Sequence, residues 1–253
     1  MMLFVESLVH FVFVLGVSYY FMSAMQWYNY RLERVVFHFH RYDWHGYFFF
    51  IPLVLYYVLP TPFVYVLYLF YPIVLLLWSQ KLDKKLVFTA RVKRFFLFLS
   101  LALIFQSILC SHLQICSKAG VILPLFIAHF LSVIFEKMAF EGFKKEARTK
   151  LQSVPELKVV AITASYGKTS IKNFLAHILS SSFHVYSTPR SVNTLGGIVK
   201  DINEALPSHT QVYIVEAGAR ERGDIDEIAR LVNPHIAIVG RIGEQHIEYF
   251  KTL

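Results

Sequence analysis

Five long apolar runs occupy the first 135 residues, and they restrict the possible folds of this chain more than any other feature. They fall at about residues 2–25, 46–59, 63–78, 95–110 and 121–135. A transmembrane helix needs about 20 apolar residues and at least about 17, so the flanks must complete the shorter runs. The mean hydropathy of +0.49 is too high for an ordinary soluble domain of this length. We therefore expect a multi-pass α-helical membrane region over residues 1–135, with about five transmembrane helices.

Basic residues are concentrated in the same half of the chain. Residues 1–150 carry 15 Lys and Arg against 7 Asp and Glu, whereas residues 151–253 carry 10 of each. Basic residues beside apolar spans set the orientation of membrane proteins, whereas a nucleic-acid-binding domain concentrates them on a folded polar surface. The distribution predicts a membrane partner and argues against nucleic acid.

The basic residues also predict an orientation in the membrane. Segments 31–41, 81–94 and 137–150 hold nearly all of them, whereas the turns at 60–62 and 111–120 hold a single charged residue. Cytoplasmic loops are the ones rich in Lys and Arg. Five crossings with an outside N-terminus would place the C-terminal half in the cytoplasm.

The two cysteines, Cys110 and Cys116, lie at the second of these turns. Their spacing does not match a zinc site. They could pair if the turn faces an oxidising compartment, but we expect free thiols.

The second half of the chain has a different periodicity. Residues 136–156 are rich in charge and predict a helix and linker leaving the membrane. Beyond them, β-rich runs alternate with helical ones, which predicts an α/β fold with a parallel sheet covered on both faces. The expected strands are 157–163, 183–186, 211–215 and 235–239, and the expected helices are 168–179, 198–205 and 224–232.

The first strand is followed by a candidate phosphate-binding loop. Free backbone N–H groups and the helix dipole favour a phosphate here, Lys168 offsets its charge, and Thr169 can hold Mg²⁺. Ile162 occupies the first glycine position of the full phosphate-loop pattern, so the Gly-Lys-Thr sequence alone is a weak signal. The strand before it and the helix after it are what indicate phosphate binding. The loop comprises Ala164, Ser165, Tyr166, Gly167, Lys168, Thr169 and Ser170.

Three further polar residues follow other strands. Glu216 ends the third strand, where a carboxylate can ligate the Mg²⁺ that bridges nucleotide phosphates. Asn193 follows the second strand and His246 the fourth. Ligands of parallel sheets bind beyond the carboxyl ends of the strands, so we expect these side chains at one site.

These motifs together resemble the central ATP-binding domain of the Mur ligases. The resemblance spans about 90 residues and begins within the strand that precedes the loop. It rests on Ile162 to Ser170, Asn193 with Gly197, Glu216 to Ala219, Gly223 to Ile225, Asn233-Pro234, Ile242-Gly243 and His246 to Glu248.

The resemblance implies an ATP-dependent amide ligase of peptidoglycan precursor synthesis in the bacterial cytoplasmic membrane. Its implied partners are a UDP-N-acetylmuramoyl peptide and D-alanyl-D-alanine, and its implied cofactors are ATP and Mg²⁺. It assigns Lys168 and the loop to the phosphates, Thr169 and Glu216 to Mg²⁺, His246 to a second metal position, and Asn193 to the transferring phosphate. Lys168, Asn193, Glu216 and His246 would thus be the catalytic set.

The chain departs from the family pattern in three ways. Ala164 replaces a usual glycine, the membrane region stands where the family has a UDP-binding domain, and residues 157–253 would be the N-terminal part of the central domain. We therefore expect this chain not to ligate by itself.

Two other functions fit the same residues. One is a related Mur-type amide ligase acting on a different acid, such as a lipid-linked one. The other is a membrane protein whose nucleotide-binding domain has a regulatory role or is inactive. The apolar runs hold few ionisable residues, so they give no sign of a transport path.

Overall fold

The computed structural model describes residues 2–37, 41–113, 120–190, 192–220 and 222–243. The chain divides into two units, Met1–Glu136 and Lys137–Leu253. The boundary falls inside one long helix, α7 (Ile122–Ser153), whose beginning belongs to the first unit and whose end belongs to the second.

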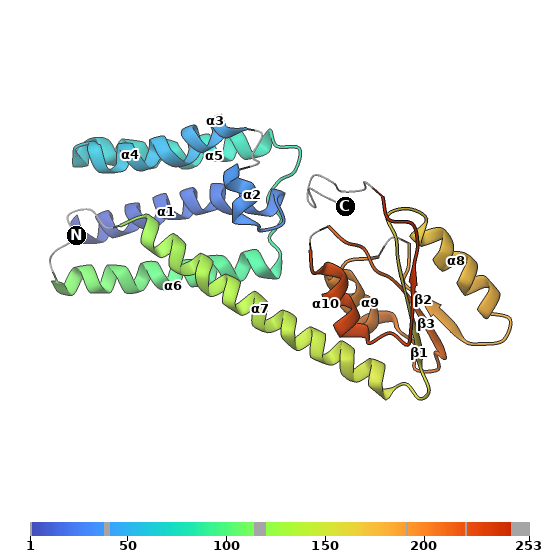
Figure 1. Cartoon of the computed structure of the whole chain (residues 1–253). Helices are drawn as coiled ribbons and strands as arrows, with labels where there is room; N and C mark the ends of the chain where they lie inside the picture. Colours follow the sequence, from blue (N-terminus) through green and yellow to red (C-terminus); the bar gives the residue numbers. More distant parts are fainter. Residues whose placement is uncertain (1, 38–40, 114–119, 191, 221, 244–253) are drawn as a thin grey trace. The chain divides into compact units, whose positions relative to one another are not determined.

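The first unit is helical throughout its regular elements (Figure 1). Within the described residues, four helices are long and apolar enough to cross a membrane: α1, α5, α6 and α7. The predicted run 46–59 is also helical, and it contains a π-helical segment, η1. Together with the preceding α3, η1 and α4 cover residues 42–58. The elements are α1 (Met2–Trp27), α2 (Leu32–Phe37), α3 (Tyr42–His45), η1 (Gly46–Phe50), α4 (Ile51–Val58), α5 (Thr61–Gln80) and α6 (Ala90–Leu113).

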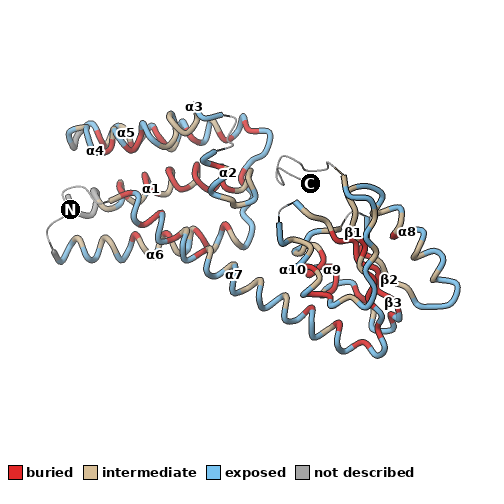
Figure 2. The backbone as a smooth tube through the Cα atoms, viewed as in Figure 1, coloured by how far each residue is buried: buried red, intermediate tan, exposed pale blue. Residues whose placement is uncertain are grey.

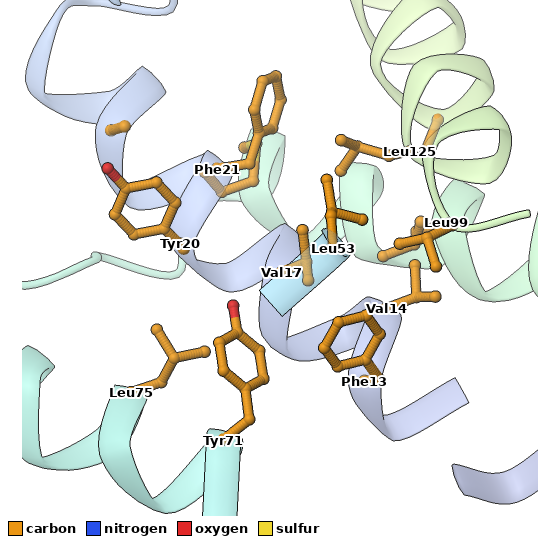
Figure 3. Close-up of a cluster of buried hydrophobic side chains, with 14 of the residues drawn as sticks. Phe13, Val14, Val17, Tyr20, Phe21, Leu53, Tyr71, Leu75, Leu99 and Leu125 are labelled. Carbon is orange, nitrogen blue, oxygen red and sulfur yellow. The ribbon is translucent and has the colours of Figure 1, made fainter. Parts of the chain in front are cut away.

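Helix α1 forms the centre of this unit. Its apolar span is 61% buried, whereas the spans of α5, α6 and α7 are 29%, 17% and 22% buried. Figure 2 shows the contrast, with buried positions frequent along α1 and sparse along α6. Figure 3 shows the core, in which side chains of α1 meet Leu53, Tyr71, Leu99 and Leu125 from the surrounding helices. The outward faces of those surrounding helices remain apolar and exposed.

Polar contacts join the charged connecting segments at the C-terminal end of α1. The Gln26 amide donates to the Val87 carbonyl (2.9 Å) and accepts from the Val87 N–H (2.8 Å). The Trp27 indole donates to the Lys84 carbonyl (2.7 Å). The C-terminal end of α1 therefore lies against the segment after α5, as expected if both are on the same side of a bilayer.

The second unit is a parallel four-stranded sheet with helices on both faces. The strand order is β2-β3-β1-β4, and every pairing is parallel. Because strand side chains alternate, Val160 and Ile162 face α8, whereas Val159 faces α9, α10 and the end of α7. The elements are β1 (Lys158–Thr163), α8 (Lys168–Leu179), β2 (Val185–Ser187), α9 (Leu195–Ala205), β3 (Val212–Glu216), α10 (Asp224–Val232) and β4 (Ile236–Val239).

The predicted α/β parallel-sheet fold is thus confirmed, and each predicted strand and helix is present within a few residues. The segment 136–156, predicted as a helix and linker, is helical as far as Ser153. Ala147, Leu151 and Val154 from this segment pack in the core beneath α9. Apolar residues at helical spacing explain the extension, since they give the charged segment one buried face.

Candidate functional site

The loop after β1 ends in a left-handed residue. Gly167 has φ +78° at the N-terminal cap of α8, a conformation that a side chain would strain. No side chain caps this helix end, so the first N–H groups of α8 and its dipole face the loop. This arrangement favours an anion.

Lys168 lies over the same loop. Its ammonium donates to the Ala164 carbonyl (2.5 Å) and the Ser165 carbonyl (3.3 Å). The side chain therefore folds back along the loop and brings a positive charge to the helix end. Tyr166 and Ser170 are exposed, so they border the loop without joining its core.

The segment after β4 forms a second wall of the loop. The Ser165 hydroxyl donates to the Gly243 carbonyl (3.1 Å) and accepts from the Gly243 N–H (2.8 Å), and the Ser165 N–H donates to the Arg241 carbonyl (2.9 Å). A Cβ on Gly240 would lie 2.8 Å from the Ala164 methyl. Gly240 thus provides the space that the alanine at position 164 needs.

Glu216 is the centre of the site. It ends β3 in the middle of the sheet, and 1% of the residue is exposed. The Thr169 hydroxyl donates to its Oε2 (2.9 Å), and the Asn193 amide donates to its Oε1 (3.3 Å). Thr169 and Asn193, predicted from two separate segments, therefore both contact the predicted carboxylate of Glu216.

Close backbone approach positions Asn193. Its carbonyl accepts from the Gly218 N–H (2.8 Å), and a Cβ on Gly218 would lie 2.9 Å from the Asn193 side chain. The glycine after Glu216-Ala217 is therefore required for Asn193 to reach the carboxylate. The next residue, Thr194, caps α9 by accepting from the Gly197 N–H (3.3 Å).

Two site residues were missed by the sequence reasoning. Lys172, one turn after Lys168 on α8, places its ammonium 3.2 Å from Glu216 Oε2 and donates to the Arg190 carbonyl. Thr188 is also buried, and its hydroxyl accepts from the Glu216 N–H (3.2 Å). The spacing of four between Lys168 and Lys172 was the available signal, since such residues share one helix face. Nothing in the sequence alone marks Thr188.

The oxygens here fit a magnesium ion. The Thr169 hydroxyl donates a hydrogen bond to Glu216, so its oxygen lone pairs can still bind a cation. Mg²⁺ is usually held by one or two carboxylates together with substrate phosphates. In the part of the chain that the structure describes, no group of three or more His, Cys, Asp or Glu could form a metal cage. His246, predicted for a second metal position, lies outside the described residues.

A parallel sheet with a glycine-containing loop after one strand and a buried carboxylate at the end of its neighbour is the arrangement typical of phosphate-binding α/β domains. Residues 162–253 match the family described as the Mur ligase middle domain. This part of the chain is therefore similar to that family over 92 residues.

The relatives narrow the likeness to one kind of Mur ligase. The UDP-N-acetylmuramoyl-tripeptide–D-alanyl-D-alanine ligase of Rickettsia prowazekii is 31% identical over 121 residues, covering 48% of this chain and 26% of the relative. The Bacillus subtilis enzyme of the same name is 32% identical over 117 residues, covering 46% and 25%. The structure of MurF ligase from Thermotoga maritima in complex with ADP is 30% identical, with a TM-score of 0.42 over 44% of this chain and 26% of that one. The chain spans about a quarter of the length of these curated relatives.

Proposed function

We propose that this chain is part of an ATP-dependent amide ligase of peptidoglycan precursor synthesis, which joins D-alanyl-D-alanine to a UDP-N-acetylmuramoyl tripeptide. The observation that carries the proposal is the convergence of Thr169 and Asn193 on buried Glu216 beside the phosphate loop. It occurs in a domain whose relatives are named for that reaction.

The reaction needs little covalent work from side chains. A substrate carboxylate oxygen bonds to the γ-phosphorus of ATP while the bond to ADP breaks, giving an acyl phosphate. The amine then attacks the acyl carbon, an amide forms, phosphate leaves and the amine loses a proton. Positioning and charge stabilisation dominate such transfers. Lys168 and the α8 N–H groups bind the phosphates. Asn193 lies near the phosphate that is transferred.

Thr169 and Glu216 would hold Mg²⁺ in this proposal. A bound Mg²⁺ supplies charge neutralisation of the nucleotide phosphates. Glu216 suits this role because β3 fixes its backbone and hydrogen bonds fix both of its carboxylate oxygens. The site is therefore organised before a ligand arrives, which lowers the cost of binding.

The first unit would anchor this enzyme in the bacterial cytoplasmic membrane. Helices α3, η1 and α4 together cover 17 residues, close to the lower limit for a span. If they cross, the basic segments 31–41 and 81–94 lie on one side, in agreement with the contacts from Gln26 to Val87 and from Trp27 to Lys84. The ATP site then follows α7 into the cytoplasm.

Cys110 supports this orientation, and it corrects the expectation of a free thiol at that position, whereas Cys116 lies outside the described residues. It is disulfide-bonded, which fits an oxidising compartment at the end of α6. An impermeant thiol reagent should label Cys110 on intact cells only after reduction. Labelling only in lysed cells would reverse the orientation.

Nucleotide binding is the first test of function. The 253-residue chain should bind a fluorescent ADP analogue with Mg²⁺, and Lys168→Ala should weaken binding about 10- to 100-fold because a charged hydrogen bond to phosphate is lost. Lys200→Ala, on the exposed face of α9, is the matched control and should change nothing. Equal binding by all three proteins would refute the phosphate site.

Turnover tests the ligase itself. The assay uses this chain joined to the part of a relative that follows the matched region. Phosphate release by that protein should require both the tripeptide substrate and D-alanyl-D-alanine. It should be lost in Lys168→Ala. Phosphate release that ignores both substrates would contradict the ligase and favour another acid substrate or a regulatory nucleotide domain.

A further inference from the structure

A buried lysine already neutralises the carboxylate of the proposed cation site. The side chains of Lys172 and Glu216 are 1% and 2% exposed, and the ammonium lies 3.2 Å from Oε2. Burying a charge costs several kcal/mol unless it is paired and hydrogen-bonded. The two side chains therefore depend on each other.

The lysine contacts the same oxygen that meets Thr169. Oε2 of Glu216 accepts from the Thr169 hydroxyl at 2.9 Å and from the Lys172 ammonium at 3.2 Å. A divalent cation between Thr169 and Glu216 would thus bind next to an existing positive charge. With one carboxylate and one ammonium, the pair is neutral, so a bare divalent cation would leave two uncompensated positive charges in a buried place.

Nucleotide phosphates would remove this obstacle. They bring negative charge to the end of α8, beside Thr169, and thereby compensate a divalent cation. Lys172 also donates to the carbonyl of Arg190, which adopts φ +47°, an unfavourable conformation for a residue with a side chain. That bond joins the pair to the loop that leads to Asn193.

We infer that Lys172 is a positioning residue and the resident counter-ion of Glu216, and that it makes divalent-cation binding depend on bound nucleotide. The inference rests on the proposed nucleotide site and deepens it. Lys172 holds the carboxylate in place when the nucleotide is absent and keeps bare cations out. The cation then enters together with the phosphates.

Mn²⁺ is the probe for the test, because electron paramagnetic resonance measures its free concentration directly without turnover. The full chain is titrated with Mn²⁺ with and without a non-hydrolysable ATP analogue. Wild type should bind Mn²⁺ more tightly with the analogue, by a factor in the roughly 5- to 150-fold range of coupled sites. Lys172→Met should bind Mn²⁺ without nucleotide and bring that ratio close to about one, because the coupling is lost. Lys172→Arg should keep the wild-type ratio.

The double variant Lys172→Met with Glu216→Gln covers the case in which an unpaired Glu216 prevents folding. Its neutral pair avoids that penalty, and it should bind no Mn²⁺ in the absence of nucleotide. The inference is overturned if Lys172→Met keeps the wild-type ratio, or if nucleotide-free wild type binds Mn²⁺ as tightly as the nucleotide complex.

Failure of the nucleotide site itself would look different. In that case the analogue would bind wild type and Lys168→Ala equally, whatever Mn²⁺ does. If Lys168→Ala binds the analogue more weakly than wild type, but Lys172→Met keeps the wild-type Mn²⁺ ratio, only the role of Lys172 is rejected.

Discussion

The two units place apolar side chains in opposite ways. In the second unit, strand residues such as Ile162 and Ile214 are fully buried, and the buried charged side chains, those of Lys172, Glu216 and Asp201, have hydrogen-bonding partners. In the first unit, α6 exposes Leu101 and Phe105 along its length, and apolar side chains cover much of the outer surface. If the first unit lies in a bilayer, as proposed, the same residue types satisfy two solvents, since apolar surface is costly in water and costs little in lipid.

Helix α7 belongs to both arrangements, so its second half offers the largest test. Leu151→Ala empties a position in the core with α9, which should cost about 2–5 kcal/mol. Hydrogen exchange in β1 and β3 should accelerate at least about 30-fold, because about 2 kcal/mol corresponds to that factor. Leu101→Ala, 55% exposed on α6, is the matched control. If both substitutions leave exchange in the sheet unchanged, the end of α7 is only a linker.

The three tryptophans allow unfolding of the first unit to be measured separately in Leu151→Ala. Trp27, Trp44 and Trp78 all lie in the first unit, so tryptophan fluorescence follows that unit alone. Leu151→Ala should leave its unfolding transition in place. A parallel shift of fluorescence and exchange would show that the two units unfold as one.

Local sequence signals predicted most of the α/β unit. The strand runs are continuous and apolar because both sheet faces are covered, and α8 begins at Lys168 as expected from Gly167 before it. The meeting of Thr169, Asn193 and Glu216 followed from the rule that the carboxyl ends of parallel strands share one edge.

What escaped prediction depends on pairings between distant segments. Lys172 looks like a surface residue of an amphipathic helix until Glu216 and the Arg190 carbonyl are brought to it. The link from Ser165 to Gly243 joins residues 78 positions apart. The buried face of residues 140–154 was hidden because charged residues dominate its composition, although its apolar positions recur at helical spacing.

A second test compares one substitution on the two surfaces. Phe105 on α6 is 67% exposed and Phe174 on α8 is 70% exposed. If α6 faces lipid, Phe105→Arg should reduce membrane insertion by about 2.5–3.5 kcal/mol, the cost of arginine near the centre of a span. Phe174→Arg faces water and should change stability by less than about 0.5 kcal/mol. Insertion is measured as the membrane-integrated fraction after alkaline extraction. Equal behaviour of the two variants would remove the distinction between lipid and water surfaces.

The smallest expected effect concerns a polar contact inside the second unit. The Tyr186 and Tyr213 hydroxyls donate to the Asp201 carboxylate at 2.7 and 3.3 Å. Burial raises the pKa of Asp201, and the two hydroxyls oppose this rise because they stabilise the ionised form. Tyr186→Phe should therefore raise the pKa further and cost about 1.5 kcal/mol at a pH above the folded-state pKa of Asp201, because a hydrogen bond to the ionised carboxylate is lost.

That cost should shrink as the pH falls through the folded-state pKa of Asp201, because the protonated carboxyl gains less from the hydroxyl. Urea unfolding of the second unit at several pH values measures it. In the Asp201→Asn background, Tyr186→Phe should show no pH-dependent effect, since the titrating group is gone. A loss that is constant across pH would mean that the Tyr186 hydroxyl contributes equally to the ionised and the protonated carboxyl, and that the charge of Asp201 adds little to this contact.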